Sequence, residues 1–120
     1  SSPDRSGEEI TEGCCVAARA ARLRGATVLF FKYTSKVIAG DGCSEICCEL
    51  GAFYEEAGDF EEAAVWYYNA AYETQPVLAL KSSVEEPLQG LIRCYEQLGL
   101  SAQARSYAEE LKHRQNDKNR

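Results

Sequence analysis

The sequence has few of the residues, and none of the motifs, on which most enzyme active sites depend. Its 120 residues include a single histidine, His113, and no methionine. A Gly-x-Ser-x-Gly turn, an Asp-x-Asp pair and a glycine-rich phosphate loop are all missing. One histidine in a polar segment leaves nothing to assemble into an acid–base pair or a triad. We therefore expect a chain that is not an enzyme and that binds no metal or other cofactor.

Long apolar runs are missing as well. No stretch approaches the ~18 apolar residues that can span a bilayer, and the opening SSPDRSGEE is not a charged-then-apolar signal segment. We expect no membrane contact and a cytoplasmic location. The length of 120 residues suffices for one continuous core. Because the chain opens on Ser1 rather than on Met, we expect it to be a piece of a longer protein.

Basic residues are missing from the middle of the chain, since no Lys or Arg occurs from Cys43 to Leu80. Eight acids occupy this segment: Glu45, Glu49, Glu55, Glu56, Asp59, Glu61, Glu62 and Glu73. With a net charge of −6, we expect no nucleic-acid binding through phosphate neutralisation. A solvated acidic face is the simplest interpretation, and attraction of a neutral or basic protein segment is the alternative.

The residues that are present give residues 45–76 the periodicity of two amphipathic helices. Apolar or small side chains recur at helical spacing on both sides of a break, at Leu50, Gly51, Tyr54, Ala63, Tyr67 and Ala70. At the break, Gly58 can end the first helix and Asp59 can cap the second. Gly51 leaves room for a close approach of the two helices. The pattern predicts a helical hairpin.

Two weaker copies flank this hairpin. Gly25 lies 33 residues before Gly58, and the pair Cys14 and Cys15 lies 33 residues before Cys47 and Cys48. Downstream, the matching residues are Leu91, Tyr95, Gly99, Ala104 and Leu111. We predict an all-α domain over residues 10–111, with about six to seven antiparallel helices in units 11–40, 44–76 and 84–111. Residues 1–9 are expected to be a disordered tail and residues 112–120 a polar tail.

The copies differ from the central hairpin in two respects. Phe30 stands where the central unit has Ala63, so the first hairpin is expected to be splayed or rotated. Tyr95 follows Tyr54 by 41 residues, which implies about seven extra residues between the second and third units. We expect the helix through residues 66–72 to overrun or the loop to bulge, with Pro76 at a kink or at the helix end. The next helix is expected to begin at Ser83 or Glu86.

The central unit resembles the tetratricopeptide repeat, whose pattern runs Leu-Gly, Tyr, Gly-Asp-aromatic, Ala, aromatic, Ala and then Pro. The matching residues are Leu50, Gly51, Tyr54, Gly58, Asp59, Phe60, Ala63, Tyr67 and Ala70, whereas Pro76 comes one residue late. The resemblance implies stacked hairpins in a right-handed superhelix that serves as a noncatalytic protein-interaction or scaffold module. An exposed end of the stack could also pair with a second copy.

In that family the first helix of each hairpin lines a groove that receives extended peptides. The corresponding residues here are Glu12, Cys15, Arg19, Arg22, Glu45, Cys48, Ala52, Glu55, Gln89, Arg93 and Glu96. The Lys and Asn that hold a terminal carboxylate in chaperone adaptors are replaced by Cys48, Ala52 and Gln89. The resemblance therefore implies a neutral or basic peptide engaging Glu45 and Glu55.

A narrower resemblance covers residues 44–111, on the segments EICCELG, WYYNAAYET and EEPLQGLIRCYEQLG. These are similar to the helical-repeat region behind the catalytic domain of certain bacterial glycosyltransferases. The alternative function is thus an accessory region that contacts a catalytic domain and aids acceptor recognition or oligomerisation.

Two residue groups leave alternatives open. Six cysteines are expected to fill small core spaces, with a redox thiol or a metal ligand less favoured. We expect Cys15 and Cys48 to lie on neighbouring helices about 8 to 10 Å apart, beyond disulfide reach. In the aromatic run, Tyr67 is expected to point inward. Trp66 or Tyr68 is expected to cover the next hairpin, or else to form an exposed aromatic platform.

Overall fold

The computed structural model describes residues 3–40, 42–77 and 85–118, with side chains from residues 10 to 117 outside the gaps. These residues form six α-helices and no strand, so the all-α prediction is confirmed. The helices are α1 (Pro3–Leu23), α2 (Thr27–Ala39), α3 (Ser44–Glu56), α4 (Phe60–Tyr68), α5 (Glu85–Gln97) and α6 (Ser101–Lys118). A π-helical turn, η1 (Asn69–Glu73), continues α4.

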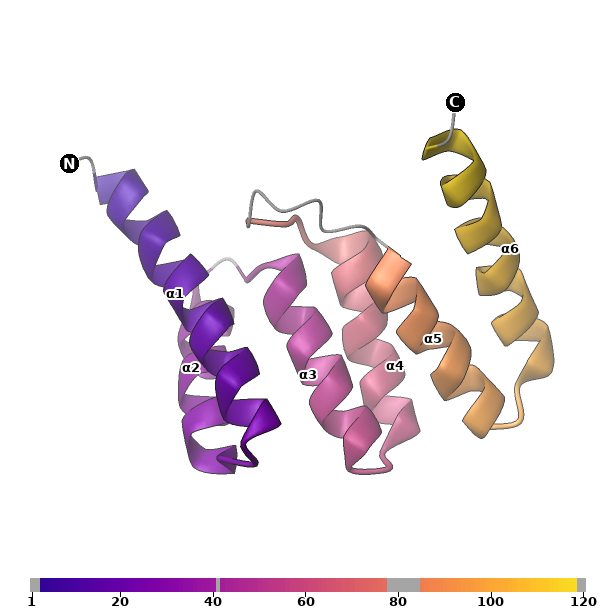
Figure 1. Ribbon diagram of the computed structural model, residues 1–120, viewed down its shortest axis with the longest axis horizontal. Coiled ribbons are helices and arrows are strands. Elements are labelled where there is room, and N and C mark those ends of the chain that lie inside the picture. Colours follow the sequence, from indigo (N-terminus) through magenta and orange to yellow (C-terminus); the bar gives the residue numbers. More distant parts are fainter. Residues whose placement is uncertain (1–2, 41, 78–84, 119–120) are drawn as a thin grey trace.

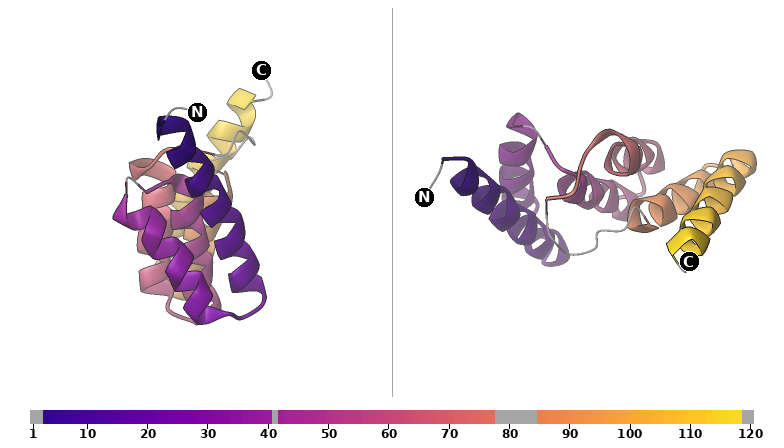
Figure 2. Two further views of the ribbon diagram at one scale, coloured as in Figure 1. Left: turned by 90° about the vertical axis from the view of Figure 1, so that its left-hand side faces the viewer. Right: turned by 90° about the horizontal axis from the view of Figure 1, so that it is seen from above.

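The helices follow one another along an elongated molecule of 47 × 37 × 21 Å. Consecutive helices run in alternating directions, and α1 and α6 lie toward opposite ends of the long axis (Figure 1). Helix α3 contacts α1 on one side and α5 on the other. Seen from above, α2 and α4 lie on one side of α1, α3 and α5 (Figure 2). The acidic helix α3 is therefore the middle of a row.

Each α1–α2, α3–α4 and α5–α6 turn contains a glycine with positive φ. The values are 72° at Gly25, 84° at Gly58 and 76° at Gly99, a region that disfavours other residues. After Gly58, the Asp59 carboxylate accepts the backbone N–H of Glu62 at 3.3 Å and caps α4. The glycine spacing in the sequence therefore marks the ends of corresponding helices.

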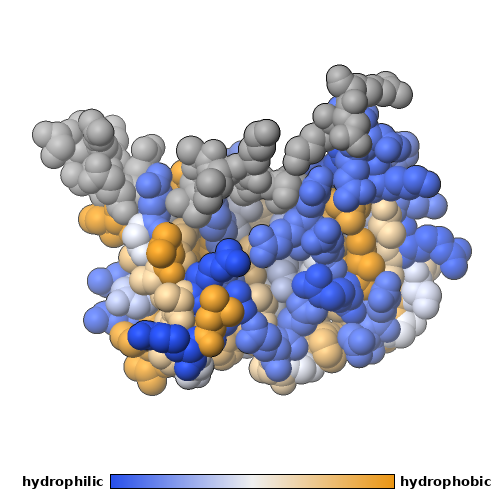
Figure 3. Space-filling view, viewed as in Figure 1, coloured by the Kyte–Doolittle hydropathy of each residue, from blue (hydrophilic) through white to orange (hydrophobic). Residues whose placement is uncertain are grey.

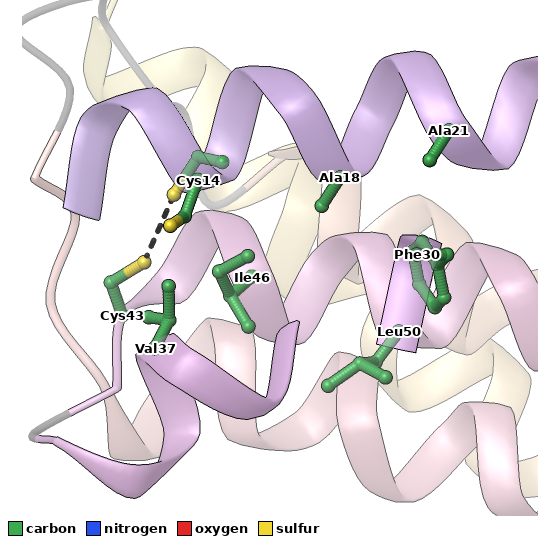
Figure 4. Close-up of a cluster of buried hydrophobic side chains, with 9 residues drawn as sticks. Cys14, Ala18, Ala21, Phe30, Val37, Cys43, Ile46 and Leu50 are labelled. Atoms are coloured by element: carbon green, nitrogen blue, oxygen red, sulfur yellow. Dashed lines mark hydrogen bonds between the residues drawn. The ribbon is translucent and has the colours of Figure 1, made fainter. Parts of the chain in front are cut away.

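The first of two buried clusters joins α1 and α2 to α3. Its buried members are Cys14, Cys15, Ala18, Ala21, Phe30, Val37, Cys43, Ile46 and Leu50 (Figure 4). The fully buried Phe30 ring stacks on Phe53 of α3, with 4.8 Å between ring centroids and 11° between the planes. The bulk of Phe30 is thus accommodated against the next helix pair, and the predicted splaying of the first hairpin stays a prediction.

The second cluster joins α4 to α5 around a single tyrosine. Its buried members are Ala63, Ala64, Tyr67, Leu88, Leu91 and Cys94. The Tyr67 ring lies between two glycines, because a Cβ built on Gly51 would come within 2.7 Å of it and one on Gly90 within 2.5 Å. The inward orientation of Tyr67 is confirmed. The close approach at Gly51 is made by this ring, however, and the role of Gly90 escaped the sequence pattern.

The described part of the segment between the second and third units follows the expectation closely. Helix α4 does overrun, as the π-helical turn to Glu73, and Pro76 follows this end rather than kinking the helix. Helix α5 begins at Glu85 and holds Pro87 in its first turn, where its missing N–H costs no hydrogen bond. The rest of the predicted insertion, residues 78–84, lies outside the described residues.

Both predicted tails contain helical residues where the structure describes them. Helix α1 begins at Pro3 rather than near residue 10, and α6 continues to Lys118 beyond the predicted end at Leu111. Polar residues extend a helix readily when its apolar turns are anchored elsewhere, and periodicity therefore underestimates its length. Among the described residues, no helix combines the length and apolar character needed to cross a membrane.

Candidate functional site

The predicted groove helices are joined by arginine–glutamate pairs, of which the first links α1 to α3. The guanidinium of Arg22 donates to both carboxylate oxygens of Glu49, with its closest contacts at 3.3 Å, and also donates to Glu56. The side chains of Arg22 and Glu49 are each only 11% exposed. This is a nearly buried ion pair between two units.

Burial and pairing oppose each other in this first pair. Burial raises the pKa of Glu49 despite the hydrogen bonds and charge of Arg22. For Arg22, burial alone would lower the pKa, but Glu49 and Glu56 reverse the effect and raise it. Glu49 therefore depends on Arg22 to remain ionised in a site that water hardly reaches.

The second pair links α3 to α5. Arg93 donates to the two oxygens of Glu55 at 2.7 and 3.0 Å, and the Tyr67 hydroxyl donates to Glu55 at 2.7 Å. Burial alone would raise the pKa of Glu55, but these hydrogen bonds lower it. The pKa of Arg93 is raised chiefly by its hydrogen bond to Glu55. Helix α3 thus supplies the acid at both junctions.

The two pairs account for most of the acids of α3 but not for those of α4. An acidic α3 lies between α1 and α5, each of which contributes one arginine to it. Hydrophilic residues accordingly gather over this central part in the view of Figure 3. Glu49 is not part of a solvated face, which corrects the simplest sequence interpretation. The sequence did contain a signal for these pairs, because Arg22 and Arg93 flank a segment that has acids but no basic residue.

The remaining predicted groove residues do not share one environment. Cys15 is buried against α3 and does not face a groove, which corrects its placement. The Glu45 carboxylate accepts the backbone N–H of Val77 at 3.1 Å. Arg19, Gln89 and Glu96 are exposed. Glu12, Cys48 and Ala52 are half-buried. Their role in peptide binding stays a prediction.

A second surface is apolar and lies where α4 meets α5 and the start of α6. We call it the α4–α5 groove, a hollow of about 630 Å³ lined by Glu61, Ala64, Val65, Tyr68, Asn69, Tyr95, Leu98 and Leu100. Val65 is 53% exposed, and Tyr68 and Leu100 are each 41% exposed. Sequence reasoning missed all of these except Tyr68. The sequence signal for this surface was the pair Leu98 and Leu100, because they flank Gly99 in a turn, where polar residues are usual.

The two residues of the possible aromatic platform, Trp66 and Tyr68, differ in exposure. Tyr68 is exposed and packs on Tyr72, with 4.8 Å between ring centroids. Tyr72 contacts Tyr107, which stacks on Tyr95 at 5.6 Å and 8°. Trp66 is instead half-buried against the first cluster, and its indole N–H is inaccessible to solvent without a partner among the described residues. Tyr68 therefore belongs to the surface without Trp66.

The six cysteines are free thiols, and five of them are buried. Cys48 is half-buried, and burial raises its pKa. The Sγ atoms of Cys15 and Cys43 lie 3.5 Å apart, a contact between α1 and the start of α3 that the sequence expectation of Cys15 beside Cys48 did not include. Within the described ranges, no group of three or more histidine, cysteine or acidic side chains could hold a metal ion.

Comparisons with known proteins do not identify a family or a function for this chain. No protein-family model, no curated protein and no solved structure matches the chain. Any function must therefore be argued from the surfaces described above.

Proposed function

We propose that the chain is a noncatalytic protein-interaction module that docks a partner segment in the α4–α5 groove. The supporting observation is the exposure of Val65, Tyr68 and Leu100 together along one hollow. Single exposed apolar residues are common, but a contiguous apolar hollow with aromatic walls is typical of a binding surface. Tyrosine adds contact area at a low cost in conformational entropy.

The occupant that this groove favours is a protein segment with apolar side chains and a neutral or basic charge. Glu61 lies in the groove, and Glu62, Asp59 and Glu73 are exposed on the same helical unit. No Lys or Arg occurs between residues 43 and 80 to offset these acids. Acids at the rim attract a basic partner and repel an acidic one, while apolar contacts supply the affinity.

The charged face of α1, α3 and α5 is a weaker candidate for the same role. Glu55 already accepts hydrogen bonds from Arg93 and Tyr67, and Glu49 from Arg22. A basic ligand would have to displace these internal donors and leave an arginine without its carboxylate. We therefore assign the docking role to the apolar groove rather than to Glu45 and Glu55.

The test is selection of short peptides from a random displayed library against the folded chain, followed by amide chemical-shift mapping of the bound peptide. Binders are expected to combine apolar residues with Lys or Arg and to shift amides around Val65 and Leu100. Val65→Ser should weaken binding about tenfold. Val16→Ser, which changes an exposed valine on α1, should leave binding unchanged.

Three outcomes would contradict the proposal. They are acidic binders, shifts centred on α1 or on the Arg93 face, and equal affinities for Val65→Ser and the unmodified chain. The alternative drawn from the sequence is an accessory region of a bacterial glycosyltransferase that aids acceptor recognition or oligomerisation. It stays a prediction, as does the cytoplasmic location.

A further inference from the structure

Two sulfurs from distant parts of the chain meet inside the first cluster. Cys15 lies in the middle of α1, Cys43 immediately precedes α3, and 28 positions separate them in the sequence. Their Sγ atoms are 3.5 Å apart, and the residues are 3% and 0% exposed. The dashed line at the Cys43 sulfur in Figure 4 marks this contact. Two thiols in van der Waals contact need only a small movement to form a bond of about 2 Å.

The two sulfurs are not chemically equivalent. Cys43 occupies the N-cap position of α3 with an extended backbone, where the positive end of the helix favours a thiolate, and the adjacent Cys15 thiol lowers the pKa of Cys43. The hydrogen bond with Cys43 and burial raise the pKa of Cys15. Because Cys43 stands at the N-terminus of α3, it is the nucleophile of the pair, and Cys15 is the thiol beside it.

We propose that Cys15 and Cys43 are a modification site at which hydrogen peroxide forms a reversible disulfide between α1 and the start of α3. The Cys43 thiolate attacks the peroxide oxygen, the O–O bond breaks, and the departing hydroxide takes a proton to give water. The sulfenic acid left on Cys43 is then attacked by the Cys15 sulfur. The S–S bond forms, and the sulfenic oxygen leaves as a second water with the Cys15 proton. Two electrons pass from the sulfurs to the peroxide.

The surroundings favour disulfide formation between Cys15 and Cys43 over reactions of the other buried thiols. Cys47 is one helical turn from Cys43, and burial raises its pKa to about 11, so its thiol remains protonated near neutral pH. Cys14 is adjacent to Cys15, but adjacent helical side chains diverge by about 100°. Because both reacting sulfurs are buried, access requires a local opening of α1 from α3. The reaction is therefore expected to be slow and specific.

The bond would close the chain from residue 15 to residue 43 and tie the first helix pair to the second. A reducing compartment keeps such a bond open until peroxide rises, as in redox-sensing proteins. Closure of this segment in the unfolded chain should raise the midpoint of thermal unfolding by about 10 °C.

The experiment exposes the folded, fully reduced chain to hydrogen peroxide, removes the oxidant and alkylates the remaining thiols in denaturant. We expect four of the six cysteines to be alkylated, a mass loss of two hydrogen atoms, and a Cys15–Cys43 cross-link on peptide mapping. Dithiothreitol should restore six alkylated cysteines and the original unfolding temperature. Cys14→Ser and Cys47→Ser are matched controls that should retain the cross-link, whereas Cys15→Ser and Cys43→Ser should lose it.

The unmodified chain is sufficient to overturn the proposal, whether or not the variants fold. Six alkylated cysteines after oxidation would overturn it, as would a Cys43 sulfinic acid without a cross-link. A mixture of cross-links that includes Cys47 or Cys94 would show that the folded geometry does not direct the reaction.

Discussion

The junction of α1 and α2 with α3 and the junction of α3 and α4 with α5 are packed by different kinds of side chain. Where α1 and α2 meet α3, the space is filled by the stacked rings of Phe30 and Phe53 and by cysteine sulfurs. Where α3 and α4 meet α5, one ring, Tyr67, occupies a slot between Gly51 and Gly90. The first junction is filled by large aromatic side chains. At the second, two glycines without side chains leave room for the Tyr67 ring between the helices.

The ion pairs differ between the junctions in the same way. Arg22 and Glu49 are nearly buried at the first junction, whereas Arg93 at the second is 52% exposed. We therefore expect the two arginine–glutamate pairs to contribute unequally to stability, because solvent screens the Arg93 pair and hardly reaches the Arg22 pair. The following variants test this contrast.

The largest effect is expected from Phe30→Ala. Removing a fully buried ring should leave a cavity against Phe53 and cost about 4 kcal/mol of unfolding free energy. Since units in such a row stabilise only their neighbours, amide hydrogen exchange should accelerate in α1 and α2 while α5 and α6 keep their protection. Leu29→Ala, at a partly exposed neighbouring position, is the control and should cost much less. Equal loss of protection in all six helices would contradict the separation of the junctions.

Arg22→Met should cost about 3 kcal/mol, because it leaves the Glu49 carboxylate buried without its donor. Arg93→Met is the matched change at the second junction and should cost less than about 1 kcal/mol. Urea unfolding of both variants measures the difference. If the two substitutions reduce the free energy of unfolding equally, burial does not determine how much each ion pair contributes.

Gly90→Ala should cost about 2 kcal/mol despite the better helix propensity of alanine. The new Cβ would lie 2.5 Å from the Tyr67 ring, which cannot retreat because Gly51 closes the other side. Gly13→Ala, a helical position with nothing within 4 Å of the new Cβ, should instead be neutral or stabilising. A neutral Gly90→Ala would mean that the ring does not fill the slot.

The smallest effect is a difference in pH dependence between the two acids. The pKa of Glu55 is lowered below its ordinary 4.5, so its contribution to stability is present above pH 4.5 and is lost as the pH falls. The pKa of Glu49 is raised above 4.5, so the folded state binds the proton more tightly and stability increases as the pH falls toward 4.5.

Urea midpoints measured across this acidic range provide the test. Glu55→Gln should reduce the loss of stability on acidification, whereas Glu49→Gln should increase it. Changes of the same sign in both variants would refute the assignment of opposite shifts.

Sequence reasoning succeeded wherever the signal was local. The helix starts and turns followed from Gly58, Asp59 and the recurrence of glycine at Gly25 and Gly99, because capping and positive φ involve only a few adjacent residues. It failed at the helix ends near Pro3 and Lys118, where apolar periodicity fades before the helix does.

For the candidate site, the sequence pointed to Tyr68 but also to Trp66, which turned inward. Three consecutive aromatic residues sweep a wide arc of helix, and only the packing of neighbouring helices decides which ones are covered. The groove partners Val65, Leu98 and Leu100 come from two units whose separation along the sequence gave no indication of contact.

The sequence by itself determined an all-α chain, its central hairpin and an acidic middle segment between arginine-bearing flanks. Only the tertiary structure decided that Gly90 meets Tyr67, that Glu49 is buried under Arg22, and that Cys15 touches Cys43. The physical reason is the range of the forces involved. Hydrogen bonds within a turn depend on neighbouring residues, whereas contacts between units depend on the rotation and offset of whole helices, which side-chain volumes set collectively.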